Sequence, residues 1–134
     1  MGFIPYAYGT GASDAYEYFT TSALGEVKLG TAMMVNQGEP EIVSGTEKAT
    51  YIAMKQGKFQ SGDEIALIRI KPTTRFVTTF AANGAAVNLG DKLQITEDGT
   101  QVTAATGGCF EVVEIKGTNI GDEVIGRFVE GGAA

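Results

Sequence analysis

From residue 24 onward, hydrophobic residues occur in short runs that are separated by polar, glycine-containing segments. The runs are rich in valine, isoleucine and threonine, which is typical of β-strands. Pairs such as Ser44-Gly45, Asn83-Gly84 and Gly107-Gly108 are turn signals between them. Many short strands at this spacing predict an all-β sandwich or small barrel rather than alternating strands and helices. The predicted strands are 27–35, 41–43, 50–55, 64–70, 75–80, 92–96, 101–104, 110–115 and 124–129.

Two local patterns predict particular turns in this region. Asp98-Gly99 separates two predicted strands and indicates a tight hairpin. Segments 62–65, 90–93 and 121–124 each begin with Gly-Asp, followed by a charged and then an aliphatic residue. Each predicts a turn with glycine at an unusual dihedral, after which a strand enters the core. The only segments compatible with a short helix are 13–22 and 81–87.

Residues 1–23 differ in composition from the rest of the chain. They contain six of the twelve aromatic residues but have no sustained helical or strand period, and Pro5, Gly9 and Gly11 interrupt them. A segment of this kind is poorly suited to fold alone. We therefore predict an extended, aromatic-rich N-terminal arm over 1–23 and a β domain over 24–134.

The aromatic residues of this arm are the candidate contact residues. Rigid rings bury a large area at low entropic cost, so exposed tyrosine and phenylalanine mark interfaces. The alternative is that Tyr16, Tyr18 and Phe19 simply cover one end of the domain, and their spacing favours neither interpretation. The candidate contacts are Phe3, Ile4, Tyr6, Tyr8, Tyr16, Tyr18 and Phe19, whereas the core is expected to hold Phe76, Phe80, Phe110 and Phe128.

Composition and charge exclude several classes of partner. The 134 residues, 43% hydrophobic and 19% charged, are enough for one domain with its own core. Ten basic and 16 acidic residues give a formal net charge of −6 without a basic cluster, so nucleic acid is not an expected partner. No apolar run approaches the roughly 18–20 residues of a membrane span. The N-terminus has no secretory signal pattern, so we expect synthesis in a reducing cytoplasm and no membrane partner.

The residue types that usually perform catalysis are absent or isolated. The chain has no histidine, which removes the commonest general base and metal ligand. Cys109 is the single cysteine, and its strand-like context is typical of a small buried hydrophobe. The acidic residues lie on separate turns without the spacing of a calcium loop, and no phosphate-binding glycine motif occurs. We therefore predict no enzyme, no catalytic residue, no cofactor and no metal site.

Three blocks occur in order along the first half of the β domain. They are Leu-Gly-Glu-Val-Lys-Leu-Gly-Thr-Ala at 24–32, Ser-Gly-Thr-Glu-Lys-Ala-Thr-Tyr-Ile-Ala-Met at 44–54 and Gly-Asp-Glu-Ile-Ala-Leu-Ile-Arg-Ile at 62–70. In composition, order and spacing these blocks resemble the head decoration proteins of tailed phages and prophages. The chain departs from that pattern at Ala49, where proline is usual, and at Ala53, where cysteine is common. After Phe76 the chain continues with Val77-Thr78-Thr79, where the family pattern ends in the acidic Phe-Glu-Thr.

The resemblance implies a non-enzymatic cement protein that binds the outer capsid surface and stabilises the DNA-filled head. It further implies a β-barrel or β-tulip-like fold, a homotrimer, the major capsid protein as partner, and the capsid surface of the virion as location. The N-terminal arm is expected to touch the shell or a neighbouring subunit. Two alternatives remain open: another structural virion protein, such as a tail-tube or head–tail joining subunit, and a carbohydrate- or receptor-binding module.

Overall fold

The computed structural model describes residues 2–7, 15–22 and 24–129, and this part of the chain contains thirteen strands and no helix. The all-β class predicted from the sequence is therefore confirmed. The strands are β1 (Ile4–Ala7), β2 (Tyr16–Thr20), β3 (Gly25–Val27), β4 (Ala32–Asn36), β5 (Glu39–Ile42), β6 (Tyr51–Ala53), β7 (Gly57–Phe59), β8 (Glu64–Arg69), β9 (Arg75–Thr79), β10 (Lys92–Ile95), β11 (Val102–Thr106), β12 (Phe110–Ile115) and β13 (Glu123–Phe128).

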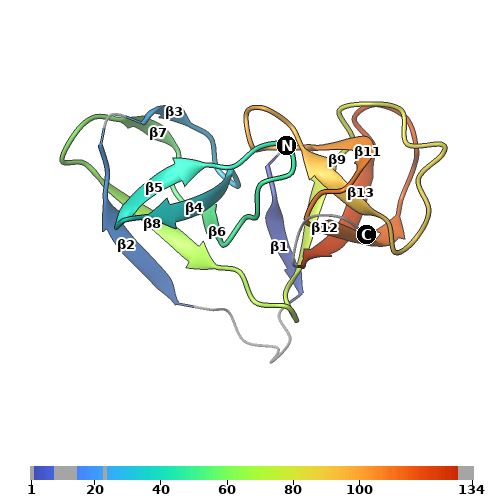
Figure 1. Cartoon of the computed structure of the whole chain (residues 1–134), viewed down its shortest axis with the longest axis horizontal. Coiled ribbons are helices and arrows are strands. Elements are labelled where there is room, and N and C mark those ends of the chain that lie inside the picture. The colour runs from blue at the N-terminus through green and yellow to red at the C-terminus, as the bar shows by residue number, and fades with distance from the viewer. Residues whose placement is uncertain (1, 8–14, 23, 130–134) are drawn as a thin grey trace.

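Two antiparallel sheets lie side by side and account for eleven of these strands (Figure 1). The five-stranded sheet has the order β2-β8-β6-β4-β5, and the six-stranded sheet has the order β1-β9-β13-β12-β10-β11. The short strands β3 and β7 pair with each other beside the five-stranded sheet. In the described residues, β11 returns towards the end of β9 through an isolated parallel bridge between Phe80 and Val102. The six-stranded sheet therefore curls without closing into a barrel, and a sandwich describes the fold better.

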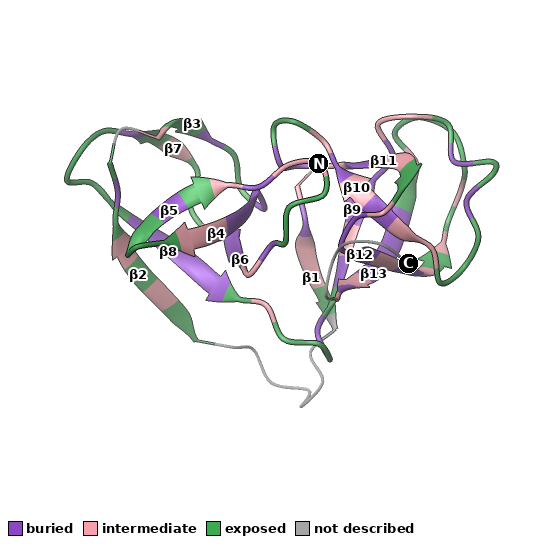
Figure 2. Ribbon diagram, in the orientation of Figure 1, coloured by how far each residue is buried: buried purple, intermediate pink, exposed green. Residues whose placement is uncertain are grey.

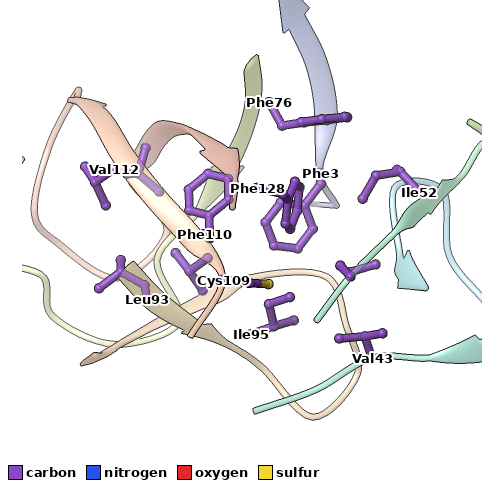
Figure 3. Close-up of a cluster of buried hydrophobic side chains, with 14 of the residues drawn as sticks. Phe3, Val43, Ile52, Phe76, Leu93, Ile95, Cys109, Phe110, Val112 and Phe128 are labelled. Carbon is purple, nitrogen blue, oxygen red and sulfur yellow. The ribbon is translucent and has the colours of Figure 1, made fainter. Parts of the chain in front are cut away.

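The main hydrophobic core joins the two sheets (Figure 3). Ile52 and Ile68 of the five-stranded sheet belong to the same buried cluster as Phe76, Phe110 and Phe128 of the six-stranded sheet. These three phenylalanines and Phe80 are at most 3% exposed, which confirms the four predicted core rings.

A second, smaller core lies on the other face of the five-stranded sheet, beneath β3 and β7. Successive strand residues point to opposite faces, so β8 sends Ile65 and Leu67 into the second core and Ile68 into the first. Figure 2 shows the result as a continuous buried stretch along β8. This strand is apolar without alternation because it is covered on both faces.

The described part of residues 1–23 is incorporated into both sheets. Strand β1 pairs with β9, and β2 pairs with β8. Phe3 is fully buried, with its ring centroid 5.3 Å from that of Phe110 and 5.0 Å from that of Phe128 (Figure 3). Its backbone N–H donates a hydrogen bond to the carbonyl of Gly30 at 2.8 Å. Strands β1 and β2, which precede residue 23, are thus hydrogen-bonded to strands that follow it.

The three Gly-Asp segments form the turns that the sequence predicts. Gly62, Gly90 and Gly121 have φ values of +94°, +91° and +90°, as required at the third position of a type II turn. The aspartate that follows each glycine accepts a hydrogen bond from the backbone N–H three residues earlier: Gln60 to Asp63, Asn88 to Asp91, and Asn119 to Asp122, at 2.8–3.0 Å. Strands β8, β10 and β13 begin directly after these turns.

The Asp98-Gly99 hairpin is also confirmed, because Ile95 of β10 pairs with Val102 of β11 across it. The Asp98 carboxylate accepts hydrogen bonds from the hydroxyls of Thr96 and Thr100. Burial alone raises the pKa of Asp98, but these hydrogen bonds outweigh that effect and lower the pKa below its ordinary value.

Some local predictions were wrong. The segment 13–22 contains β2 rather than a helix, because pairing with β8 satisfies its backbone. Residues 81–87 form bends and turns, and Gly84 packs against the ring of Phe80, where a side chain has no room. The single strand predicted over 27–35 is interrupted at Gly30, whose φ is +83°. Strand β7 was not predicted at all.

Candidate contact surface

The structure distributes the seven predicted contact residues over different environments. Phe3 is buried in the main core, and Ile4 and Phe19 are half-buried. Tyr8 lies outside the described residues. The remaining three are exposed: Tyr6 by 56%, Tyr16 by 46% and Tyr18 by 61%. Among the described members of the set, these three are the exposed ones, and they come from the edge strands β1 and β2.

Strand β2 brings two of these tyrosines together at the edge of the five-stranded sheet. On its inner side it pairs with β8, where Tyr16 lies opposite Ile68 and Tyr18 opposite Ala66. Among the described residues, no strand is hydrogen-bonded to its outer side, although β5, at the opposite edge of the same sheet, approaches β2. Alternate residues of a strand share a face, so Tyr16 and Tyr18 project together. We call the outer side of Tyr16–Thr20 and these two side chains the tyrosine edge.

A charged and aromatic cluster on the opposite face of β2 holds the tyrosine edge in place. The Glu17 carboxylate accepts two hydrogen bonds from Arg69, from Nε and Nη2, each at 3.0 Å. The Arg69 guanidinium lies 5.0 Å from the ring centroid of Tyr51, and Phe19 packs edge-on against the same ring at 5.3 Å. The hydrogen bond from Arg69 lowers the pKa of Glu17, whereas burial raises the pKa of the Tyr51 hydroxyl.

A cleft of about 470 Å³ is lined by parts of both large sheets. Its walls come from the segment before β6, from the end of β8 and the residues after it, and from the end of β13. Three of the nine lining residues are cationic, namely Lys48, Arg69 and Arg127, and none is acidic. Sequence patterns did not indicate this cleft, because the three cationic residues lie far apart in the chain.

Cys109 is fully buried, as predicted, and burial raises the pKa of its thiol. Its Sγ lies 3.6 Å from the carbonyl oxygen of Glu47. Within the described ranges, no group of three or more cysteine, aspartate or glutamate residues is placed to hold a metal ion. No helix that is long and apolar enough to cross a membrane occurs in the same part of the chain.

Comparison with known proteins identifies a shared fold. No protein-family model matches the chain, and no curated protein matches its sequence. Among solved structures, the chain is similar to the N base of the head fiber gp8.5 of bacteriophage phi29. The match has a TM-score of 0.58 and covers 90% of this chain and 99% of that one. The two sequences are 19% identical, so the likeness establishes the fold alone.

Proposed function

We propose that this protein is a non-enzymatic structural component of a tailed-phage head, a decoration protein that binds the outer capsid surface and stabilises the DNA-filled shell. The observation that carries the proposal is the fold likeness to the base of a phage head fiber over nearly the whole of both chains. The three sequence blocks at 24–32, 44–54 and 62–70, which resemble head decoration proteins, support the same class independently.

The exposed tyrosines give this proposal a contact surface. An edge strand with an unpaired side can accept a further strand from a partner, and backbone hydrogen bonds then supply affinity without a specific sequence. The tyrosine edge combines such a side with two exposed rings, which are favoured in interfaces. We therefore assign capsid or neighbouring-subunit contact to Tyr16 and Tyr18, and a secondary contact to Tyr6. Phe3 serves the fold instead.

The decisive experiment uses particles from the phage that encodes this chain, produced with the coding region deleted. Purified protein is added to these particles, and cryo-electron microscopy locates it, while the temperature of DNA release measures head stability. The proposal predicts regular density on the outer shell and DNA release at a higher temperature after addition. Density on the tail or at the head–tail joint would instead favour a tail-tube or head–tail joining subunit. Absence from the particle would refute a virion role.

A pair of double variants tests the contact surface. Tyr16→Ala with Tyr18→Ala should reduce binding to the particles, because it removes both rings while keeping the paired backbone of β2. Leu89→Ala with Ile120→Ala is the matched control, since these side chains are 66% and 69% exposed but lie on loops of the six-stranded sheet. Equal loss of binding in the two variants would contradict the assignment of the tyrosine edge.

A further inference from the structure

The four edge strands of the two large sheets are not equally protected against the addition of a further strand. Proline has no N–H to donate, and natural sheets carry it on edges that stay unpaired. Of the three prolines of the chain, Pro5 lies in the edge strand β1 and Pro40 in the edge strand β5. The edge strand β11 is bridged at Val102 by Phe80 and accepts a hydrogen bond there from Ala81. Among the described residues, β2 has neither kind of protection.

The backbone of β2 presents unpaired polar groups on its outer side. The N–H of Thr21, directly after β2, donates to the carbonyl of Asp63 at 2.7 Å, on the side of β8. Backbone groups alternate between the two sides of an antiparallel strand, so those of Tyr16, Tyr18 and Thr20 point outward. The two tyrosines therefore offer a free backbone edge as well as exposed rings.

Strand β5, at the opposite edge of the same sheet, approaches β2 but does not pair with it. Cα atoms of the two strands come within 8 Å, without a hydrogen bond between them. The N–H of Val43 donates to the carbonyl of Ala32, which places the backbone of Pro40 on the outer side of β5, where it has no N–H to donate. Figure 1 shows β5 meeting β2 near the start of β5 and then running away from it. We call this opening between β2 and β5 the seam.

The outer face of the seam is aromatic and acidic. The strand register across the sheet places Tyr16 and Tyr18 of β2 on the same face as Glu39 and Glu41 of β5. All four residues are exposed, and neither glutamate forms an ion pair with a described residue. Cations are attracted both by carboxylates and by the faces of tyrosine rings. This face therefore favours basic side chains.

The inner face of the seam is apolar. Phe19, Val35 and Ile42 are half-buried there and pack against the second core. An extended segment in the seam turns successive residues to opposite faces. Its basic residues on the outer face should therefore alternate with aliphatic residues on the inner face. A second copy of β2, Tyr-Glu-Tyr-Phe-Thr, has no basic residue and does not match this pattern.

We propose that the seam binds an extended segment of a partner protein in which basic residues alternate with aliphatic ones, and that this segment pairs with β2 through its backbone. On the virion the partner would be the capsid shell, and this clause alone rests on the proposed function. A strand with neighbours on both sides needs about 9–10 Å between them, so the segment pairs with β2 where β5 has diverged from it. The formal net charge of −6 also favours a basic partner.

The first test uses a fluorescein-labelled peptide in which lysine alternates with valine, with binding followed by fluorescence anisotropy. The seam variant is Glu39→Gln with Glu41→Gln. The matched control is Glu26→Gln with Glu97→Gln, which removes the same charge from exposed positions outside the seam. We expect affinity to fall about threefold to tenfold in the seam variant and to change little in the control. Circular dichroism of both variants establishes that they are folded.

The second test uses the wild-type protein and examines backbone pairing. Two further peptides carry N-methyl groups, one on every valine amide and the other on every lysine amide. Each modification blocks the donors along one edge of the extended peptide. Pairing with β2 alone uses a single edge, so one modified peptide should bind like the parent and the other about tenfold or more weakly.

Several outcomes would overturn the inference. They are equal weakening in the seam and control variants, no weakening in the seam variant, and equal affinity of the two methylated peptides. Analytical ultracentrifugation tests the other possible occupant. A wild-type dimer that becomes a monomer in Tyr16→Ala with Tyr18→Ala would identify a second copy of the chain at this edge, which also overturns the inference.

The same variants on particles separate this inference from the proposed function. If the wild-type protein decorates particles and the seam variant does so equally well, the seam contact with the shell is refuted and the decoration role stands. If the wild-type protein binds the peptides as expected but binds no particle, the decoration role fails and the preference of the seam stands.

Discussion

Replacing Phe3 with alanine should strongly destabilise the protein, although Phe3 is only the third residue of the sequence. The ring is fully buried, with centroids of Phe110 and Phe128 at 5.3 and 5.0 Å. Those neighbours belong to β12 and β13 and cannot collapse into the space that the ring would leave. Removing a buried phenylalanine side chain in this way costs about 3–5 kcal/mol of unfolding free energy, which is a large fraction of the stability of a small domain.

Urea unfolding followed by far-ultraviolet circular dichroism measures this loss, since the chain has no tryptophan to report by fluorescence. Tyr6→Ala is the matched control, because Tyr6 lies in the same segment but is 56% exposed. We expect the control to change the unfolding free energy by less than about 1 kcal/mol. A comparably small loss for Phe3→Ala would refute the packing of the N-terminal segment into the core. It would instead favour an arm that is separate from the β domain.

Three further predictions concern a turn, an ion pair and the thiol. Gly99→Ala should destabilise the protein more than Gly90→Ala in urea unfolding. Both glycines have positive φ, which costs about 1–2 kcal/mol for alanine, but only at Gly99 would the new Cβ meet neighbouring methyl carbons, at 2.9 Å. The hydrogen bond from Arg69 lowers the pKa of Glu17 below its ordinary 4.5, so this stabilisation is present above the unfolded pKa and is lost as pH falls through the folded pKa. Glu17→Gln should therefore flatten part of the dependence of the unfolding free energy on pH in the acid range. The change should be at most about 1 kcal/mol, because the ion pair is exposed. Cys109 should react with a thiol reagent far more slowly in the native protein than in urea, because burial restricts access and raises the thiol pKa.

Each of these predictions has a contradicting result. Equal destabilisation by the two glycine variants would show that the tight contact at Gly99 relaxes without cost. An unchanged acid profile in Glu17→Gln would show that the bond to Arg69 contributes nothing to folding in solution. Rapid labelling of native Cys109 would contradict its burial.

The features that sequence patterns predicted correctly are those decided within a few residues. The Gly-Asp turns depend on one glycine with positive φ and one aspartate that accepts a hydrogen bond from three residues earlier. The β10–β11 hairpin depends on Asp98-Gly99 in the same local way. The core phenylalanines of β9, β12 and β13 were recognisable because each lies within a strand pattern.

The features that the sequence patterns missed depend on partners that are distant in the chain. Strand β2 is a strand because β8 lies beside it, and its anchor joins Glu17 to Arg69, 52 residues away. Phe3 gave no periodic signal, since its burial depends on strands more than a hundred positions later. For the same reason, the predicted contact set mixed a core residue with the exposed tyrosines.

Composition and local pattern alone determined that this chain is an all-β protein and that its turns fall at glycine residues. They also determined that it has no histidine and a negative net charge. Tertiary structure alone decided which aromatic residues face solvent, how the two sheets share one core, and where three cations meet in a cleft. The physical reason is the range of the interactions involved. A turn is stabilised by neighbours in sequence, whereas burial and charge clustering depend on which strands pair.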